Sequence, residues 1–287
     1  TAFIGCSTMK ITVPFFKTGA NITNDGFKDC LTAMSFSSNK IKASVKLIRD
    51  IGNNWEEASK KALKECTKEI GIESGKVDPE KCFGLLFCDT ASSKDGDILE
   101  TLFAESNIFF IGGGSAGNMK AFDWIMKGTS GVPGYVHTKD GTFADSAAMA
   151  IIHCEVPFKI DLTTSFYPSP TKFTVTKVKE QNIGKTKMWR VEEFDGKPAA
   201  EEYVKALGVS KFNLGMERLP NIPFFMHHPL GLMVKNRAYI RFIGVKKGKS
   251  LLLPSKVENG QELYLMERGD IIASTKQTMA ELKKDLG

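Results

Sequence analysis

The feature that most constrains how this chain folds is a short apolar run, residues 108–111, that continues directly into Gly112, Gly113 and Gly114. Four apolar residues in succession are typical of a strand covered on both faces, as in a parallel sheet under helices. Glycine has no Cβ and tolerates positive φ, so the backbone N–H groups of a turn here can contact a ligand, or another segment can pack closely against them. We therefore predict a strand that ends in a turn of bare main chain. This turn either binds a ligand or lets another segment pack closely, and the pattern does not decide between the two.

A similar pattern occurs at the start of the chain. Phe3-Ile4-Gly5 matches Phe110-Ile111-Gly112, and small or hydroxyl-bearing residues follow both copies. Two copies separated by roughly a hundred residues indicate a duplicated α/β unit and not a short-period repeat protein.

The residues between the two copies predict alternating strands and helices. Residues 40–49 and 82–88 have strand patterns, and 54–70 and 96–106 have the apolar spacing of helices. Residues 82–111 then form a strand, helix, strand unit with a right-handed crossover. Ligands bind beyond the carboxyl ends of the strands in such sheets, where the glycine turn is expected. The second helix is expected to turn four apolar side chains inward: Ile98, Leu99, Leu102 and Phe103.

The second half of the chain is predicted to be richer in antiparallel strands. Short alternating segments joined by turns begin near Pro133, and Tyr167-Pro168-Ser169-Pro170 has the composition of an extended linker. We place the domain boundary there, between a first domain, 1–168, and a second, 169–287. The predicted fold class is α/β, with two α/β halves, mixed sheets, a duplicated strand-turn unit in the first half and an antiparallel-rich second half. The last predicted element is an amphipathic helix at 275–286.

Composition narrows the class of protein. The 287 residues are 42% hydrophobic and 25% charged, which is ordinary for a soluble globular protein with room for two domains. The net charge of +6 comes from lysines interleaved with acidic residues, so no nucleic-acid partner is expected. No apolar run approaches the ~20 residues of a membrane span. The six cysteines lack metal-ligand spacing, which favours a reduced, cytoplasmic compartment. Because the chain opens on Thr1 in a strand pattern, we expect it to be part of a larger protein.

Two patterns could carry catalysis or cofactor binding. The motif Gly112-x-Gly114-x-x-Gly117 is that of a dinucleotide-binding turn. However, no capped helix follows it, and no acidic residue ends a strand about twenty positions later, so dinucleotide binding is disfavoured. Cys6 and Ser7 are candidate nucleophiles of an enzyme, although the spacing places no histidine beside them.

Two further patterns concern ligands of the second half. His227 and His228 are adjacent, so both cannot face one site on a strand; they are weak candidates for a haem ligand and predict no paired metal site. Arg241 alternates with the apolar residues of its strand, so it is either an exposed residue or an anion-binding guanidinium.

Several motifs resemble the FIST sensory domain family. The segments Ile4-Gly5-Cys6-Ser7-Thr8 and Ile111-Gly112-Gly113-Gly114-Ser115-Ala116-Gly117 are similar to its two Gly-Ser signatures. Phe194-Asp195-Gly196-Lys197-Pro198-Ala199, His228-Pro229-Leu230-Gly231 and Tyr239-Ile240-Arg241 are similar to motifs of its C-terminal half. The resemblance covers essentially the whole chain. Relative to the family pattern, the first strand and helix and the closing strand with its Gly-Glu turn are missing, which would remove part of a pocket wall.

The resemblance implies a ligand-sensing module of bacterial signal transduction that binds small molecules such as amino acids, with haem-based sensing in some members. It also implies a downstream signalling domain, or a histidine kinase or chemoreceptor-type protein, as partner. We expect backbone N–H groups of the glycine turn and the Arg241 guanidinium to bind a small carboxylate. The alternatives are an enzyme that uses the same cleft, which we disfavour, and a haem-binding gas sensor. The expected ligand-binding residues are Ser7, Thr8, Gly113, Gly114, Ser115, Asn118 and Arg241.

Overall fold

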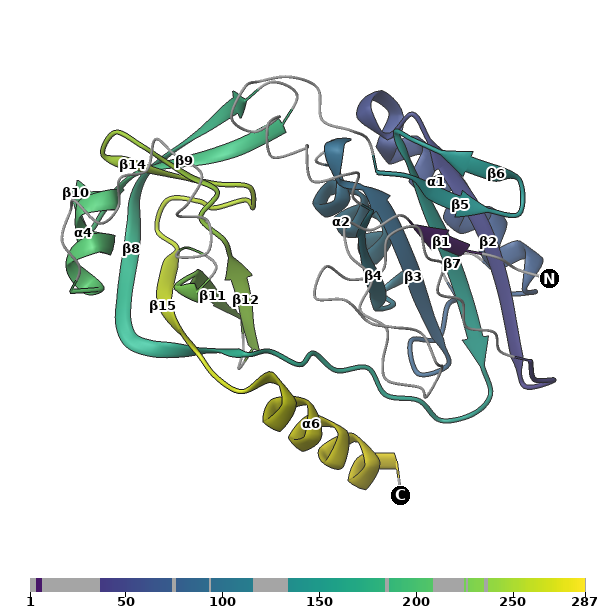
Figure 1. Cartoon of the computed structure of the whole chain (residues 1–287). Helices are drawn as coiled ribbons and strands as arrows, with labels where there is room; N and C mark the ends of the chain where they lie inside the picture. Colours follow the sequence, from purple (N-terminus) through teal and green to yellow (C-terminus); the bar gives the residue numbers. More distant parts are fainter. Residues whose placement is uncertain are drawn as a thin grey trace, which may run out of the picture. The chain divides into compact units, whose positions relative to one another are not determined.

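The computed structural model describes residues 4–6, 37–73, 76–92, 94–115, 134–183, 186–208, 225, 227–234 and 237–286. The chain divides into two compact units, residues 1–160 and 161–287 (Figure 1). The elements are helices and strands in mixed order, which confirms a mixed α/β fold.

The first unit is built on a four-stranded sheet. Its strands, in spatial order, are β2 (Ile41–Arg49), β7 (Ser146–Cys154), β3 (Cys82–Asp89) and β4 (Phe110–Ser115). Only the pair β3 and β4 is parallel among these strands. Helices α1 (Ile51–Glu69) and α2 (Asp95–Ser106) contribute to one apolar core with this sheet. A second, three-stranded sheet contains β1 (Ile4–Cys6), β5 (Val136–Thr138) and β6 (Gly141–Phe143).

Helix α1 confirms the predicted helix but begins three residues earlier, with residues 51–53 separated from the rest by a kink at Asn54, whose φ of −128° and ψ of 32° are not helical. Its apolar stripe is buried or packed against the core, as its spacing predicts. Gly71, with φ of 81°, follows its last turn, and the N–H of Ile72 donates to the carbonyl of Thr67. The early start comes from a distant residue: Asp145 accepts the N–H of Ile51 with its carbonyl oxygen and that of Gly52 with its carboxylate. These bonds satisfy N–H groups that the first turn leaves free.

The strand, helix, strand unit formed by β3, α2 and β4 is confirmed. Ile98 and Leu102 of α2 are fully buried, as predicted, whereas Leu99 is 38% and Phe103 49% exposed. Only one narrow stripe of α2 reaches the core, so the prediction that all four apolar side chains turn inward was wrong for two of them.

The glycine run lies inside a strand, and the predicted turn at that point was wrong. Gly112, Gly113 and Gly114 belong to β4 and pair in parallel with Leu86, Phe87 and Cys88 of β3, and the pairing continues to the end of the strand. Gly112 has φ of 146°, and a Cβ there would lie 1.9 Å from the carbonyl oxygen of Leu86. The absence of a side chain is therefore needed for strand packing at this position.

The similarity between the two Phe-Ile-Gly segments does not correspond to a structural repeat in the described residues. β1 pairs antiparallel with β5, whereas β4 pairs parallel with β3 in a different sheet. The predicted duplication of a strand-turn unit is therefore not confirmed, and the residues that follow the first copy lie outside the described part of the chain.

The second unit is dominated by antiparallel strands. The order is β12 (Arg237–Arg241), β11 (Leu230–Val234), β15 (Glu262–Arg268), β8 (Phe166–Ile183), β9 (Thr186–Phe194), β14 (Ser250–Leu253) and β13 (Val245–Lys247), with β10 (Lys197–Pro198) beside β9. All the pairings found among these strands are antiparallel. The helices α4 (Ala199–Ala206) and α6 (Ile271–Leu286) also belong to this unit.

Strand β8 joins the two parts of this large sheet. Residues 166–174 pair with β15, and residues 175–183 pair with β9. The register between β8 and β9 shifts between Val175 and Val178. The segment Tyr167-Pro168-Ser169-Pro170, predicted to be a linker, is part of β8: Pro168 lies opposite Met266. The sequence-based boundary at 168/169 therefore falls inside a strand, while the two compact units meet at 160/161.

Candidate functional site

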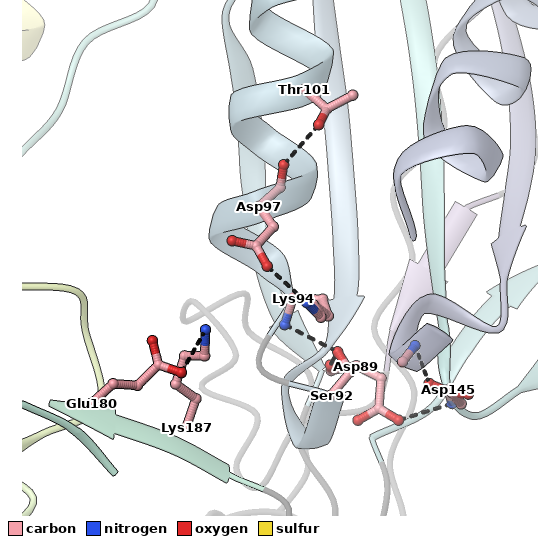
Figure 2. Close-up of polar contacts among 9 residues, drawn as sticks. Asp89, Ser92, Lys94, Asp97, Thr101, Asp145, Glu180 and Lys187 are labelled. Carbon is pink, nitrogen blue, oxygen red and sulfur yellow. Dashed lines mark hydrogen bonds and ion pairs between the residues drawn. The ribbon is translucent and has the colours of Figure 1, made fainter. Parts of the chain in front are cut away.

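The carboxyl ends of β3 and β4 carry Asp89 and Ser115. Asp89 is 2% exposed, and one of its carboxylate oxygens accepts the backbone N–H of Gly134 at 3.0 Å. The other accepts the backbone N–H of Asp145 at 2.9 Å (Figure 2). Charge-assisted bonds of this kind are about twice as strong as neutral ones. Asp89 therefore ties the end of β3 to two later segments of the first unit.

Ser115 is fully buried, and its polar atoms are used within the protein. Its hydroxyl donates to the carbonyl of Cys88 at 3.2 Å, and its carbonyl accepts the hydroxyl of Thr90 at 2.8 Å. A Cβ on Gly134 would lie 2.1 Å from the Ser115 carbonyl oxygen. The surroundings of Ser115 are thus tightly packed, and a ligand would have to compete with existing hydrogen bonds.

The backbone of β4 presents a free edge among the described strands. The N–H of Gly84 donates to the carbonyl of Phe109 at 2.8 Å. Because backbone groups alternate along a parallel pair, the N–H groups of Gly112 and Gly114 then point away from β3. Both glycines are exposed, and a Cβ on Gly113 would meet no atom within 4 Å. The alternation thus places backbone N–H donors along a strand edge, where the sequence predicted a turn.

Arg241, in the second unit, is a half-buried cation without an acidic partner in the described part of the chain. It ends β12 opposite Leu230. Its Nε is buried and has no hydrogen-bond partner, and the guanidinium makes one long bond, 3.4 Å, to the carbonyl of the adjacent Ile240. Burial lowers the pKa of the Arg241 guanidinium, which shows that its charge is partly desolvated. Such a group can bind an anion through two parallel N–H donors.

The two histidines differ in their surroundings. His227 is exposed, and its Nδ1 lies 3.2 Å from a guanidinium nitrogen of Arg268. His228 is half-buried, its carbonyl accepts the hydroxyl of Tyr203 at 2.6 Å, and burial together with His227 lowers the pKa of its imidazole. An exposed ring does not fit an enclosed haem ligand, whereas the neutral imidazole favoured at His228 can bind iron.

Among the described residues, nothing near Cys6 would activate it as a nucleophile. Burial raises the pKa of its thiol. Its nearest histidine in the sheet, His137, is paired with Gly5 and not with Cys6, so alternation along β1 directs the two side chains to opposite faces. The His137 Nδ1 lies 2.9 Å from the Thr142 hydroxyl.

Three of the expected ligand-binding residues, Ser7, Thr8 and Asn118, lie outside the described residues. Within the described ranges, no group of three or more His, Cys, Asp or Glu side chains could hold a metal ion. No helix in the part of the chain that the structure describes is long and apolar enough to cross a membrane.

Sequence reasoning missed Asp89 and Asp145 as organising residues. The available signal at Asp89 was an acidic residue placed directly after a buried strand. Nothing local distinguishes Asp145, because its importance depends on contacts with α1 and β3, which are far from it in the sequence.

These features define a mixed α/β protein with exposed backbone donors on one unit and, on the other, a half-buried arginine that has no acidic partner among the described residues. The chain belongs to the FIST family: the model of the FIST N domain, a sensory domain of signal transduction, matches residues 1–185. This confirms the resemblance in the sequence. Because the match ends at residue 185, the resemblance of the remaining residues to the C-terminal half of the family stays a prediction.

One curated relative has a comparable sequence. The chain is 27% identical over 233 residues to the uncharacterized protein MJ1623 of Methanocaldococcus jannaschii. The alignment covers 77% of this chain and 41% of that protein, so the chain spans about two fifths of the length of this relative. No solved structure matches the chain.

Proposed function

We propose that this chain is a small-molecule-binding sensory module whose ligand is an amino acid or a similar small carboxylate. The observation that carries the proposal is Arg241, a half-buried guanidinium whose Nε has no partner in the described part of the chain. An unpaired buried donor is costly, and cations are rarely buried alone without a reason. A carboxylate ligand would supply the two acceptors that this guanidinium lacks.

The glycine strand is the second proposed element of recognition. Gly113 and Gly114 are exposed on β4, and the N–H of Gly114 points away from β3. Exposed backbone N–H donors suit an anionic or carbonyl-bearing ligand. Space beside Gly113 is open, whereas the Thr90 side chain lies next to Gly114. Ser7, Thr8, Ser115 and Asn118 stay in the proposed set, although Ser115 already uses its hydroxyl internally.

The cellular setting follows from the family and is also proposed. A sensory domain needs an output, so we propose a cytoplasmic module that acts on a downstream signalling domain, or on a histidine kinase or chemoreceptor-type protein. A ligand can change the output only by binding two conformational states with different affinity.

Isothermal titration of the chain with a panel of amino acids and organic acids tests the proposal. We expect one carboxylate to bind, and Arg241→Gln to weaken that binding roughly 10- to 100-fold, the effect of removing a hydrogen bond to a charged group. Arg237→Gln is a matched control, because Arg237 lies on the same strand but already pairs with Asp161 at 2.8 Å. No heat with any carboxylate, or equal effects of the two substitutions, would count against the proposal.

A second titration tests the glycine strand separately. Gly113→Val adds a side chain where a Cβ has open space, so the fold should tolerate it while close approach to the strand is hindered. Weaker binding with unchanged thermal stability is expected.

The haem alternative has its own test, motivated by the lowered pKa of His228. It requires a Soret band after reconstitution with haem that disappears in His228→Ala and persists in His227→Ala. Absence of the band in the wild-type chain would eliminate it.

A further inference from the structure

Arg241 lies on the apolar face of its sheet. Residues directly opposite each other on antiparallel strands point to the same face of the sheet. Arg241 is opposite Leu230, and Leu230 is opposite Leu265 of β15. Leu230 and Leu265 are 0% and 7% exposed and belong to the apolar core of the second unit. The guanidinium therefore shares a cross-strand row with two buried leucines.

The neighbouring row on this face is also apolar. Tyr239, two residues before Arg241, is opposite Leu232. Leu232 packs against the same core and is opposite Leu263, which is fully buried. Tyr239 and Leu232 are thus the nearest positions to Arg241 in this second row, within reach of long side chains. A molecule bound to the guanidinium on this face would lie beside apolar side chains.

No acidic side chain in the described ranges offers a second charge beside Arg241. Burial alone lowers the pKa of its guanidinium, without an opposing effect of a nearby carboxylate. This matters for amino acids, which carry an ammonium group next to their carboxylate. With the carboxylate on Arg241, the ammonium would lie close to a cation and beside leucine side chains. A partly buried charge without a counter-charge is costly.

We propose that the ligand of Arg241 is a monocarboxylate with an apolar body and without an ammonium group, such as a branched-chain carboxylic acid. The inference rests on the proposed function and narrows it: of an amino acid and a similar small carboxylate, charge and packing favour the second. The carboxylate accepts the guanidinium N–H groups, including that of the unpaired Nε. The apolar body covers the partly exposed side chains of Tyr239 and Leu232.

Isothermal titration of the chain with 4-methylpentanoate and with L-leucine tests the lack of an ammonium group. Leucine is the same acid with an ammonium group added beside the carboxylate. We expect 4-methylpentanoate to bind at least about 10-fold more tightly, because only leucine has to bury an unpaired charge. Leucine binding with equal or higher affinity would overturn this inference and leave the proposed function standing.

Acetate and succinate test the apolar body. Acetate keeps the carboxylate but lacks the branched chain, and succinate has a second charge in its place. Both are expected to bind at least about 10-fold more weakly than 4-methylpentanoate, since burial of hydrocarbon is lost. A preference for either acid would overturn the inference alone. No heat with any of these acids or with the wider panel of carboxylates would overturn the proposed function together with it.

Two tyrosine substitutions test on which face the ligand binds. Tyr239→Ala is expected to weaken 4-methylpentanoate binding roughly 3- to 10-fold and to leave acetate binding nearly unchanged, because the contact with Arg241 persists. Tyr264→Ala is the control: Tyr264 is opposite Gly231 and so points to the other face. Neither tyrosine is buried, and thermal melting verifies that both variants fold. Equal affinities of the two variants for 4-methylpentanoate would overturn the placement on the leucine face.

Discussion

The carboxylate of Asp89 accepts the backbone N–H of Asp145 at 2.9 Å, and Asp145 in turn accepts two N–H groups at the start of α1 (Figure 2). The end of β3 lies 38 positions after the start of α1. These bonds connect the two through a third segment, which lies 56 positions after Asp89. The first unit is thus organised by one buried acidic side chain near the ends of its central strands.

Asp89→Asn is expected to destabilise the first unit by about 2 kcal/mol. Asparagine offers one acceptor and one NH₂ group, so one of the N–H groups of Gly134 and Asp145 would face a donor. The shift of the urea unfolding midpoint measures this loss. Asp97→Asn is the control, since Asp97 forms a partly exposed ion pair with Lys94 and its removal should cost less than about 1 kcal/mol. Equal midpoints for the two variants would contradict the assignment.

Gly112→Ala is expected to lower the melting temperature strongly, because its Cβ would lie 1.9 Å from the Leu86 carbonyl oxygen and its φ is 146°. Overpacking of this kind typically costs about 1 to 3 kcal/mol. Gly113→Ala, one position later, should leave stability within about 0.5 kcal/mol of the wild-type value, since no atom lies near its Cβ. Calorimetry of both variants checks the contrast, and similar losses at the two positions would show that β4 is packed differently.

Arg241→Met is expected to abolish carboxylate binding while leaving the unfolding free energy unchanged or higher by up to about 1 kcal/mol. The reason is that the substitution removes a buried Nε without a partner and keeps an apolar side chain of similar length. Urea unfolding and titration of the same preparation measure the two effects. A loss of stability above about 1 kcal/mol would indicate instead that Arg241 supports the fold.

Acidification is expected to destabilise the second unit through His228. Burial and His227 lower the pKa of His228 below its usual 6.5, so the unfolded chain takes up this proton at a higher pH than the folded chain. The contribution of His228 to stability is therefore complete above about pH 6.5 and is lost as the pH falls through the lower folded pKa. Urea midpoints between about pH 7.5 and pH 5 measure it.

His228→Gln should flatten this decline, and His227→Gln should reduce it, because each substitution removes one of the causes. An identical decline in all three proteins would assign the acid sensitivity to other groups.

Cys66 and Cys88 are expected to resist alkylation in the folded chain. Both are buried, and burial raises the pKa of Cys66 to about 11 and that of Cys88 to about 12, so almost no thiolate is present at about pH 8. Iodoacetamide labelling with peptide mass spectrometry, before and after unfolding in urea, measures this. The same experiment tests the enzyme alternative: labelling of Cys6 faster than free cysteine would show an activated thiol.

Local patterns in the sequence predicted most elements of the described fold. The stripe of α1 and the strands β2 and β3 were found because apolar periodicity and stop signals such as Gly71 act within one segment. The side-chain directions of Leu99 and Phe103 were missed, because a short helix can present two adjacent stripes and only its neighbours decide which one is buried.

The glycine run and the proline segment were both assigned to the wrong kind of structure. Glycine and proline favour turns and linkers when no partner strand is considered. In the structure, Gly112 to Gly114 pair with β3, and Pro168 lies in β8 opposite Met266. Pairing with distant strands therefore outweighed the local preference in both places.

By itself, the sequence determined the family, the mixed α/β class and Arg241 as a candidate anion-binding residue, because these depend on short motifs and on the alternation within one strand. Only the tertiary structure decided that Arg241 is half-buried without an acidic partner in the described residues, that Asp89 holds Gly134 and Asp145, and that the glycines form a strand edge. Burial and cross-strand hydrogen bonds join residues that are far apart along the chain, so no single segment contains the information that determines them.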